Sequence, residues 1–222
     1  MRGNVCVVQS IDNAVRRAYA KGMAGALLKA ENAAETGWTY ADYKAWELKP
    51  GERWEIIYGE AFAMSAPSAY HQSILTELLK QIAVFLTGRE CKAYPAPYDV
   101  RLFWEEDPDG EDVGSDDTIV QPDISVVCDK KKRGPEGCRG APDFVVEILS
   151  PSNTAIEMQR KFNLYRDAGV CEYWVVDSES KSLITYLFDG DRVSSKTYGE
   201  KDTAAVASLP GLSIEMAPVF DE

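Results

Sequence analysis

The spacing of apolar residues predicts two main helices in this chain. In AYHQSILTELLKQIAVFLTG the apolar positions fall on one stripe at helical spacing, with Ser68 as the capping residue before it and Gly88 at its end. A second helix, which contains EMQRKFNLY, should begin at the capping-box sequence of Thr154 and end at Gly169. A shorter capped helix is predicted over residues 39–46.

Runs of β-branched and aromatic residues between the helices predict strands. QPDISVVCD and PDFVVEILS have the composition of buried strands, and EYWVVD is so continuously apolar that a central position is expected. RWEIIYGEAFAMSA and KSLITYLFDGDRVSSKTY predict hairpins, while Pro95 and Pro97 place the strand CKAYPAPYDVRLFW at an edge or a bulge. LPGLSIEMAPVF predicts one more short strand. The predicted fold class is α/β, a mixed sheet flanked by helices in the order helix, strand, strand, strand, helix, strand, with added hairpins.

Length and composition suggest one domain with an appendage. Residues 1–37 form a predicted N-terminal extension, loosely helical or disordered, and residues 38–222 form the domain. A hydrophobic fraction of 45% and a charged fraction of 27% are ordinary for a soluble globular protein. No apolar stretch has the length of a membrane span, and the N-terminus is too weak for a secretory signal. The five cysteines are odd in number and contain no CxxC pair, so reduced thiols and a cytoplasmic location are expected.

The net charge of −12 counts against tight non-specific binding to nucleic acid, which usually depends on a basic surface. Much of this acidity is local, because residues 105–117 contain eight acids and no base, and a solvated acidic loop is expected there. The concentrated basic patch predicts either a solvated loop or a loop that contacts phosphate beside a cleft. Its members are Lys130, Lys131, Lys132, Arg133 and Arg139.

Two carboxylates interrupt the apolar strands. Side chains alternate between the faces of a strand, so Glu147 shares its face with Val145, whereas Asp123 opens its strand. An ionised carboxylate in a dry sheet is costly unless it is paired or binds a metal. Pairing with Arg101 or Arg139 is the simpler interpretation for Asp123 alone, but it is weaker for Glu147, whose sequence neighbours are apolar.

A lysine occupies the apolar side of the second main helix. At about one hundred degrees per residue, Met158, Lys161, Phe162 and Tyr165 lie on one face. A lysine at this position must either extend past the core to solvent or reach an anion inside it. If this helix covers the strand that carries Glu147, two acids would be able to grip Mg²⁺ while the lysine positions water and phosphate. That combination is typical of a divalent-metal phosphodiesterase.

These residues also resemble a known family. The Pro-Asp pair ending at Asp123, followed by the distant Glu147, is similar to the motif of the PD-(D/E)XK nuclease superfamily. The resemblance to one branch, the Uma-two family of restriction-endonuclease-like proteins, extends over five ordered blocks: RWEIIYGEAFAMSAPSAYHQ, VQPDISVVCD, GAPDFVVEILSPSN, KFNLYRDAGVCEYWVVD and LPGLSIEM. It implies a restriction-endonuclease-like core, with Mg²⁺ or Mn²⁺ as cofactor and the main-chain carbonyl of Ile148 facing the metal. No lysine stands two residues after Glu147, so the resemblance assigns that role to Lys161 on the following helix.

Two further residues are candidates for the site. Glu60 follows a tight turn, where a solvated acid is the common outcome. His71 lies on the apolar stripe near the start of its helix, where a hydrogen-bonded core histidine is common, but this helix end can border the cleft in such a fold. The predicted catalytic residues are Asp123, Glu147, Lys161, Glu60 and His71, and the predicted metal ligands are Asp123, Glu147 and Ile148.

The function predicted from these features is that of a Mg²⁺-dependent endonuclease, a hydrolase that cleaves phosphodiester bonds of DNA. One alternative is a catalytically silent nuclease fold that serves as a binding or regulatory module and could form a homodimer. Another is a phosphodiesterase that acts on RNA or nucleotides, because no base-reading element is recognisable. A membrane is not expected as a partner.

Overall fold

A computed structural model describes residues 37–104, 114, 116–151 and 153–221 of the chain. Residues 1–36 of the predicted extension over residues 1–37, and most of the acidic segment, lie outside the described residues. The described helices and strands follow one another as α2 (Tyr40–Lys44), β1 (Trp54–Ile57), β2 (Glu60–Ala63), α3 (Ala69–Leu86), β3 (Lys92–Pro95), β4 (Val100–Arg101), β5 (Ile119–Val120), β6 (Ile124–Val127), the 3₁₀ turn η1 (Lys130–Lys132), β7 (Arg133–Gly134), β8 (Gly137–Arg139), β9 (Phe144–Leu149), α4 (Ala155–Ala168), β10 (Glu172–Asp177), β11 (Ser182–Asp189), β12 (Arg192–Gly199), β13 (Thr203–Ala205), β14 (Ser213–Glu215) and α5 (Met216–Val219).

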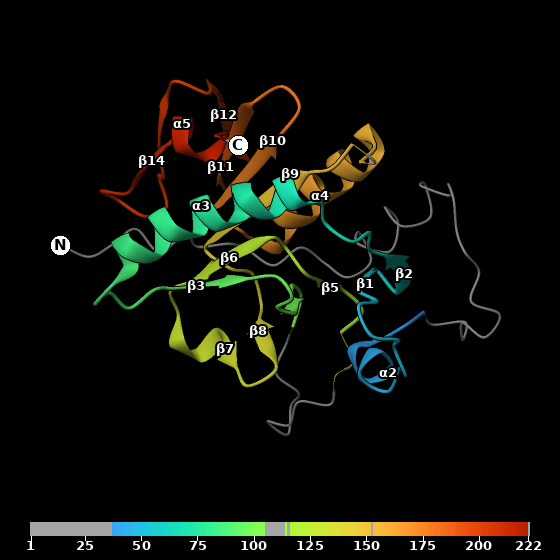
Figure 1. The fold of residues 1–222 in the computed structure, drawn as a ribbon. Helices are drawn as coiled ribbons and strands as arrows, with labels where there is room; N and C mark the ends of the chain where they lie inside the picture. Colours follow the sequence, from blue (N-terminus) through green and yellow to red (C-terminus); the bar gives the residue numbers. More distant parts are fainter. Residues whose placement is uncertain (1–36, 105–113, 115, 152, 222) are drawn as a thin grey trace.

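The largest sheet has the strand order β12-β11-β10-β9-β6-β3 and is mixed (Figure 1). Strands β9 and β10 run parallel, with α4 as their connection, and the other neighbours are antiparallel. The strand EYWVVD is β10, an inner strand as predicted, and Pro95 ends β3 at the sheet edge, where the missing N–H of a proline is tolerated. A second sheet has the order β2-β1-β5-β4-β8-β7, and β13 pairs with β14.

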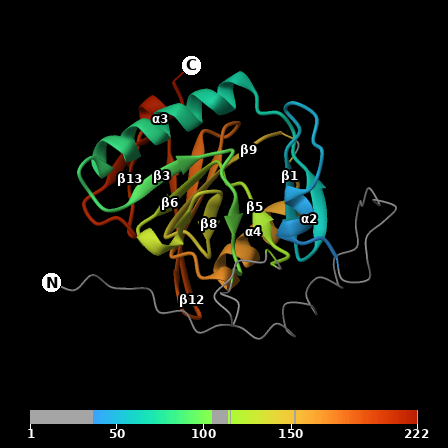
Figure 2. The same cartoon turned by 90° about the horizontal axis from the view of Figure 1, so that it is seen from below.

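Helices α3 and α4 cover opposite faces of the large sheet (Figure 2). On the α3 face, Ile74, Leu78 and Ile82 of the helix pack in one cluster with Val146 of β9 and Trp174 of β10. On the α4 face, a separate cluster joins Leu164 and Tyr165 of the helix to Val145 of β9 and Val175 of β10. The alternation of side chains along β9 therefore turns Glu147 towards α4, as the sequence predicts.

The predicted ends of the helices agree with the structure. Ser68 caps α3 by accepting a hydrogen bond from the His71 N–H, and Thr154 forms a reciprocal capping box with Glu157 at α4. Helix α4 ends at Gly169, whose φ of 90° lies in the left-handed region that glycine adopts without a steric penalty. These caps fix where each helix begins beside the strands, and so fix which residues of the first turns meet the sheet.

Three sequence-based expectations need correction. The segment CKAYPAPYDVRLFW is not one strand, because β3 belongs to the large sheet and β4 to the second sheet. The last segment forms the short helix α5 as well as strand β14. Cys91 and Cys128 are joined by a disulfide rather than being free thiols, since the β3–β6 register places positions 91 and 128 opposite each other.

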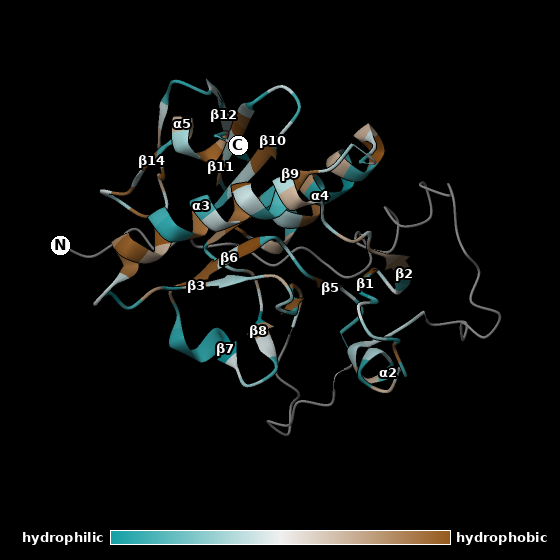
Figure 3. Ribbon diagram, viewed as in Figure 1, coloured by the Kyte–Doolittle hydropathy of each residue, from teal (hydrophilic) through white to brown (hydrophobic). Residues whose placement is uncertain are grey.

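Four of the five residues of the basic patch lie in η1 and at the start of β7. Figure 3 shows η1 and β7 as a hydrophilic segment on the side of the molecule opposite the β1–β2 hairpin. Lys132 Nζ donates to the Ala141 carbonyl and Arg133 donates to the Cys128 carbonyl, so both side chains tie down their own loop.

Among the residues that the structure describes, no helix combines the length and hydrophobicity needed to cross a membrane.

Candidate active site

A cleft of about 180 Å³ opens where the β1–β2 hairpin, the first turn of α3, the ends of β6 and β9, and the first turns of α4 meet. Five predicted residues line it, although they come from four different elements and span a large part of the sequence. They are His71, Asp123, Glu147, Ile148 and Lys161. Glu60 does not line this cleft, so its predicted role gains no support from the geometry.

Glu147 and Lys161 form the centre of the cleft floor. Lys161 Nζ lies 2.8 Å from Glu147 Oε1, and the Tyr165 hydroxyl donates to the same carboxylate oxygen. The Lys161 side chain is only 19% exposed, so it does not extend past the core to solvent. The lysine on the apolar face of α4 instead reaches an anion inside the protein, which is the second of the two outcomes considered from the sequence.

A third carboxylate, Glu55, also contacts this lysine. Lys161 Nζ lies 3.0 Å from Glu55 Oε1, and the main-chain N–H of Gln121 donates to the same oxygen at 2.9 Å. Glu55 is 5% exposed and lies on β1, far from Lys161 in the sequence. Sequence reasoning missed Glu55. The sequence feature that could have identified it is a charged residue between the apolar positions of the predicted strand RWEII.

Asp123 faces the start of α3 and the end of β9. Its Oδ2 atom accepts the main-chain N–H of Ile148 at 2.8 Å and lies 3.2 Å from His71 Nε2. The expected pairing of Asp123 with an arginine is wrong for Arg101, which forms a buried ion pair with Asp116 instead. Asp123 therefore joins the two strand ends through a charge-assisted hydrogen bond.

Burial and charge shift the ionisation of this group. Burial raises the pKa of Glu147 to about 7, and the nearby charges of Asp123 and Glu55 add to this effect while Lys161 opposes it. Burial lowers the pKa of Lys161, but the charges of Glu147 and Glu55 outweigh burial and hold it above its ordinary value. The single ammonium of Lys161 contacts the carboxylates of both Glu55 and Glu147, so the group carries excess negative charge. This charge favours either a proton retained on a carboxylate or an added cation.

His71 lies at the edge of this charged group. Burial lowers the pKa of its imidazole, but the hydrogen bond and charge of Asp123, together with the nearby Ile148 carbonyl, raise it above the ordinary value. Its Nδ1 atom is buried and forms no hydrogen bond with any residue that the structure describes. Asp123 and the Ile148 carbonyl both raise the pKa of this imidazole, so the two groups present negative potential to the same point.

The donor atoms fit a hard divalent cation. Within the described residues, Asp123 Oδ1 and Glu147 Oε2 accept no hydrogen bond, so each carboxylate is oriented through one oxygen and keeps the other free. The N–H and C=O of a strand residue point to the same side, so the Ile148 carbonyl faces the side on which its N–H meets Asp123. No group of three or more His, Cys, Asp or Glu side chains suited to a metal occurs among the described residues. Two carboxylates, one carbonyl and waters form a donor set typical of Mg²⁺, which retains part of its hydration shell.

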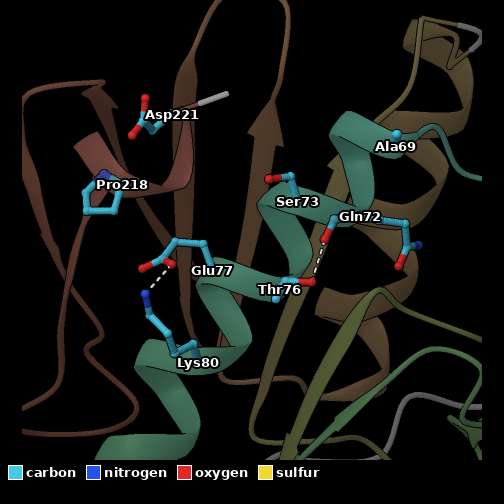
Figure 4. Close-up of a pocket in the computed structure, with 8 residues that line it drawn as sticks. All are labelled: Ala69, Gln72, Ser73, Thr76, Glu77, Lys80, Pro218 and Asp221. Carbon is cyan, nitrogen blue, oxygen red and sulfur yellow. Dashed lines mark hydrogen bonds and ion pairs between the residues drawn. The ribbon is translucent and has the colours of Figure 1, made fainter.

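A second, more open groove lies on the outer side of α3, beside α5 (Figure 4). Its side chains satisfy one another along the helix surface, because Lys80 pairs with Glu77 and the Thr76 hydroxyl donates to the Gln72 carbonyl. Figure 4 shows Asp221 apart from these pairs, on the other side of the groove. The groove brings together no buried charges, so the cleft at Glu147 is the better candidate for chemistry.

The core of helix α3, strands β3, β6 and β9, helix α4 and strand β10 is a restriction-endonuclease-like α/β fold. A crystal structure from Anabaena variabilis, described as “a putative nuclease belonging to DUF820”, is similar over 82% of this chain and 97% of its own. The TM-score is 0.63 and the identity 20%. At this identity the likeness establishes the fold alone.

The chain belongs to the Uma2 family, whose model carries the description “Putative restriction endonuclease” and matches residues 40–217. The resemblance read from the sequence blocks is thereby confirmed. Two proteins of Synechocystis sp. are also similar. The uncharacterized protein slr1290 is 27% identical over 151 residues, which are 68% of this chain and 74% of its own length. The uncharacterized protein sll1609 is 24% identical over 157 residues, 69% of this chain and 82% of its own length.

Proposed function

We propose that this protein is a Mg²⁺-dependent endonuclease that hydrolyses phosphodiester bonds of DNA. The observation that carries the proposal is the contact of Lys161 with Glu147 in a cleft that Asp123 also lines. Membership of a family whose description is “Putative restriction endonuclease” supports the reaction class, while the ion and the DNA substrate are proposed from the chemistry of the cleft. Mn²⁺ is expected to replace Mg²⁺, because it accepts the same oxygen ligands.

Asp123, Glu147 and the Ile148 carbonyl would hold the ion. The chemistry that such an ion supplies is neutralisation of charge on phosphate oxygens and activation of water. The Ile148 N–H keeps Asp123 pointed at the ion position, and Tyr165 and Lys161 do the same for Glu147 by occupying one of its oxygens. The ligands are therefore preorganised by neighbours that belong to the packed core.

Lys161 would act on the water and on the phosphate. Its raised pKa keeps it a cation at neutral pH, so it donates hydrogen bonds and does not serve as a base. A fixed ammonium at the cleft floor can orient the attacking water and stabilise the charge that develops on the phosphate during attack. Glu55 also holds this ammonium, through the contact of its Oε1 with Lys161 Nζ, and is a positioning residue.

The test is cleavage of plasmid and single-stranded DNA by the purified protein with Mg²⁺ or Mn²⁺ over a range of salt concentrations. Wild-type protein should cut, and Asp123→Ala and Lys161→Ala should each lower the rate by at least about 100-fold. Lys130→Ala, a basic residue outside the cleft, is the matched control for a general loss of positive charge. Undiminished cutting by both cleft variants would reject this site.

The same assay separates the alternative functions. Cleavage of RNA in preference to DNA would change the proposed substrate and keep the cleft chemistry. Absence of cutting together with absence of calorimetric Mn²⁺ binding would favour the silent binding or regulatory module. A cytoplasmic location, a homodimer and a domain boundary near residue 38 stay predictions, to be checked by fractionation, by light scattering and by proteolysis.

A further inference from the structure

Two arginines in the cleft are not used by the proposed reaction. Arg53 immediately precedes β1, and Arg160 lies on α4 next to Lys161 in the sequence. Both line the cleft together with Phe62 of β2. A cation in such a position usually pairs with a carboxylate, but neither arginine forms an ion pair within the part of the chain that the structure describes.

Arg53 is held in place by a neutral partner. Its Nε donates to Gln121 Oε1 at 2.9 Å, and the Gln121 amide donates in turn to Asp99 Oδ1 at 2.8 Å. The Arg53 Nη2 atom is buried and forms no hydrogen bond with any described residue. Leaving a buried donor unsatisfied costs about 1–3 kcal/mol. Arg53 therefore lines the cleft with an oriented guanidinium whose charge no carboxylate among the described residues neutralises, so this charge is available to an anionic ligand.

Arg160 is held in place by an aromatic ring. Its guanidinium lies 4.4 Å from the centre of the Phe62 ring, and a cation–π contact fixes the side chain without neutralising it. Phe62 pairs with Glu55 across the β1–β2 hairpin, so both side chains stand on the same face of the hairpin. The stacked Arg160 is therefore placed beside the contact between Glu55 and Lys161.

Arg53 lies close to that contact along the chain. It stands just before β1 and two residues before Glu55, which in extended backbone corresponds to a displacement of roughly 7 Å along the same face. Gln121 couples the two positions, because its main-chain N–H holds Glu55 while its side chain holds Arg53. The cleft thus has an anionic floor at Asp123 and Glu147 and a cationic wall formed by Arg53 before β1 and Arg160 on α4.

We propose that Arg53 and Arg160 bind a phosphate group of the substrate strand that neighbours the phosphate being cleaved. The inference rests on the proposed nuclease function, and it specifies the substrate class as a polynucleotide with at least two consecutive phosphates. Guanidinium groups suit this task, because their planar fork binds phosphate oxygens through two hydrogen bonds. The acidic protein thereby binds a polyanion through a small cationic wall inside the cleft rather than through its whole surface.

Binding without cleavage gives the first test. Anisotropy of a fluorescent single-stranded DNA oligonucleotide is measured with Ca²⁺, an ion of the same ligand preference as Mg²⁺, at several salt concentrations. Arg53→Gln and Arg160→Gln should each raise the Kd about 5- to 10-fold, and each should reduce the slope of log Kd against log salt by about 0.7. Lys130→Gln on the basic turn removes the same charge outside the cleft and should leave both values unchanged. Thermal unfolding checks that every variant is folded.

A substrate change gives the second test. Replacing the phosphate next to the cleaved one with a neutral methylphosphonate should raise the KM of the wild-type protein about 5- to 10-fold, and should have a smaller effect in Arg53→Gln. Arg53→Lys, which keeps the charge but lacks the fork, should fall between wild type and Arg53→Gln. Equal effects of the methylphosphonate in all proteins would overturn the proposal.

The two proposals fail in different ways. If the wild-type protein cuts DNA and both arginine variants bind and cut like it, the phosphate subsite is wrong and the nuclease stands. If the wild-type protein binds but does not cut, and the arginine variants bind more weakly, the nuclease is wrong and the subsite stands. If the wild-type protein does not bind the oligonucleotide, the subsite is wrong.

Discussion

Strand β9 places very different side chains on the two faces of the large sheet. Towards α3 it presents Phe144 and Val146, which are fully buried in a continuous apolar cluster. Towards α4 it presents Val145 and then Glu147, whose carboxylate contacts Lys161. Apolar side chains need only a dry, close-packed environment, whereas a buried carboxylate needs named partners within hydrogen-bond distance. We therefore expect the α3 face to contribute mainly stability, and the α4 face to contribute both stability and the proposed chemistry.

A cavity on the α3 face should have the largest effect on stability. Leu78 is fully buried there, so Leu78→Ala should lower the free energy of unfolding by about 2–5 kcal/mol, because it removes packed methyl groups and leaves a void. The rate of cleavage per folded molecule should stay the same. Denaturant unfolding and active-site titration measure the two quantities. Val84→Ala, at a side chain that is 71% exposed, is the control and should change stability by less than about 0.5 kcal/mol.

A change on the α4 face should have the opposite pattern. Glu55→Gln keeps an acceptor for Lys161 but removes a charge, so kcat should fall about 10- to 100-fold with little change in KM. The charge of Glu55 also raises the pKa of Glu147, so this variant should move the pH midpoint of Mn²⁺ binding to a lower value. A loss of stability without any shift of that midpoint would contradict a positioning role.

The pH dependence of Mn²⁺ affinity should report the charge balance around Glu147. A raised pKa of about 7 means that Glu147 keeps its proton at mildly acidic pH, where an ordinary glutamate is ionised. Ion binding must displace that proton, so affinity should fall about tenfold per pH unit below 7 and level off above it. Calorimetry in two buffers of different ionisation enthalpy should detect proton release at pH 6. Glu147→Gln should bind weakly, with a flat profile over this range.

The smallest effect is expected outside both faces. Lys80 pairs with Glu77 on the open groove of α3, and the Lys80 side chain is 62% exposed. Lys80→Ala should therefore change the free energy of unfolding by less than about 1 kcal/mol and leave cleavage unaltered, because solvent screens exposed pairs. Thermal unfolding and the plasmid assay check both statements. A large loss of cleavage would show that this groove takes part in the reaction.

Much of the fold could be predicted because its signals are local. Capping residues mark the starts of α3 and α4, and alternation along β9 sets the face of Glu147. The position of Lys161 on the apolar side of α4 also follows from helical spacing alone. Each of these features depends on residues that are close together in the sequence, so the order of residue types is enough to predict it.

The partners of those residues could not be predicted in the same way. Glu55 meets Lys161 across 106 positions of sequence, and Gln121 joins Glu55 to Arg53 only because β1 pairs with β5 just before β6 begins. The disulfide between Cys91 and Cys128 depends on the register of β3 against β6. Cysteine counting favoured free thiols, because the composition of a chain does not contain strand register.

The order and spacing of residue types were enough to predict the two main helices, the buried faces of the inner strands and the family. Which charged groups share the cleft depends on how the elements pack together. Lys161 Nζ donates to Glu55 Oε1, Asp123 accepts from the Ile148 N–H, and Arg53 Nη2 has no partner among the described residues. The physical reason is that side-chain periodicity is a property of one element. Contact between elements depends instead on the order of strands in a sheet and on their register. The same set of predicted helices and strands is compatible with several strand orders and registers.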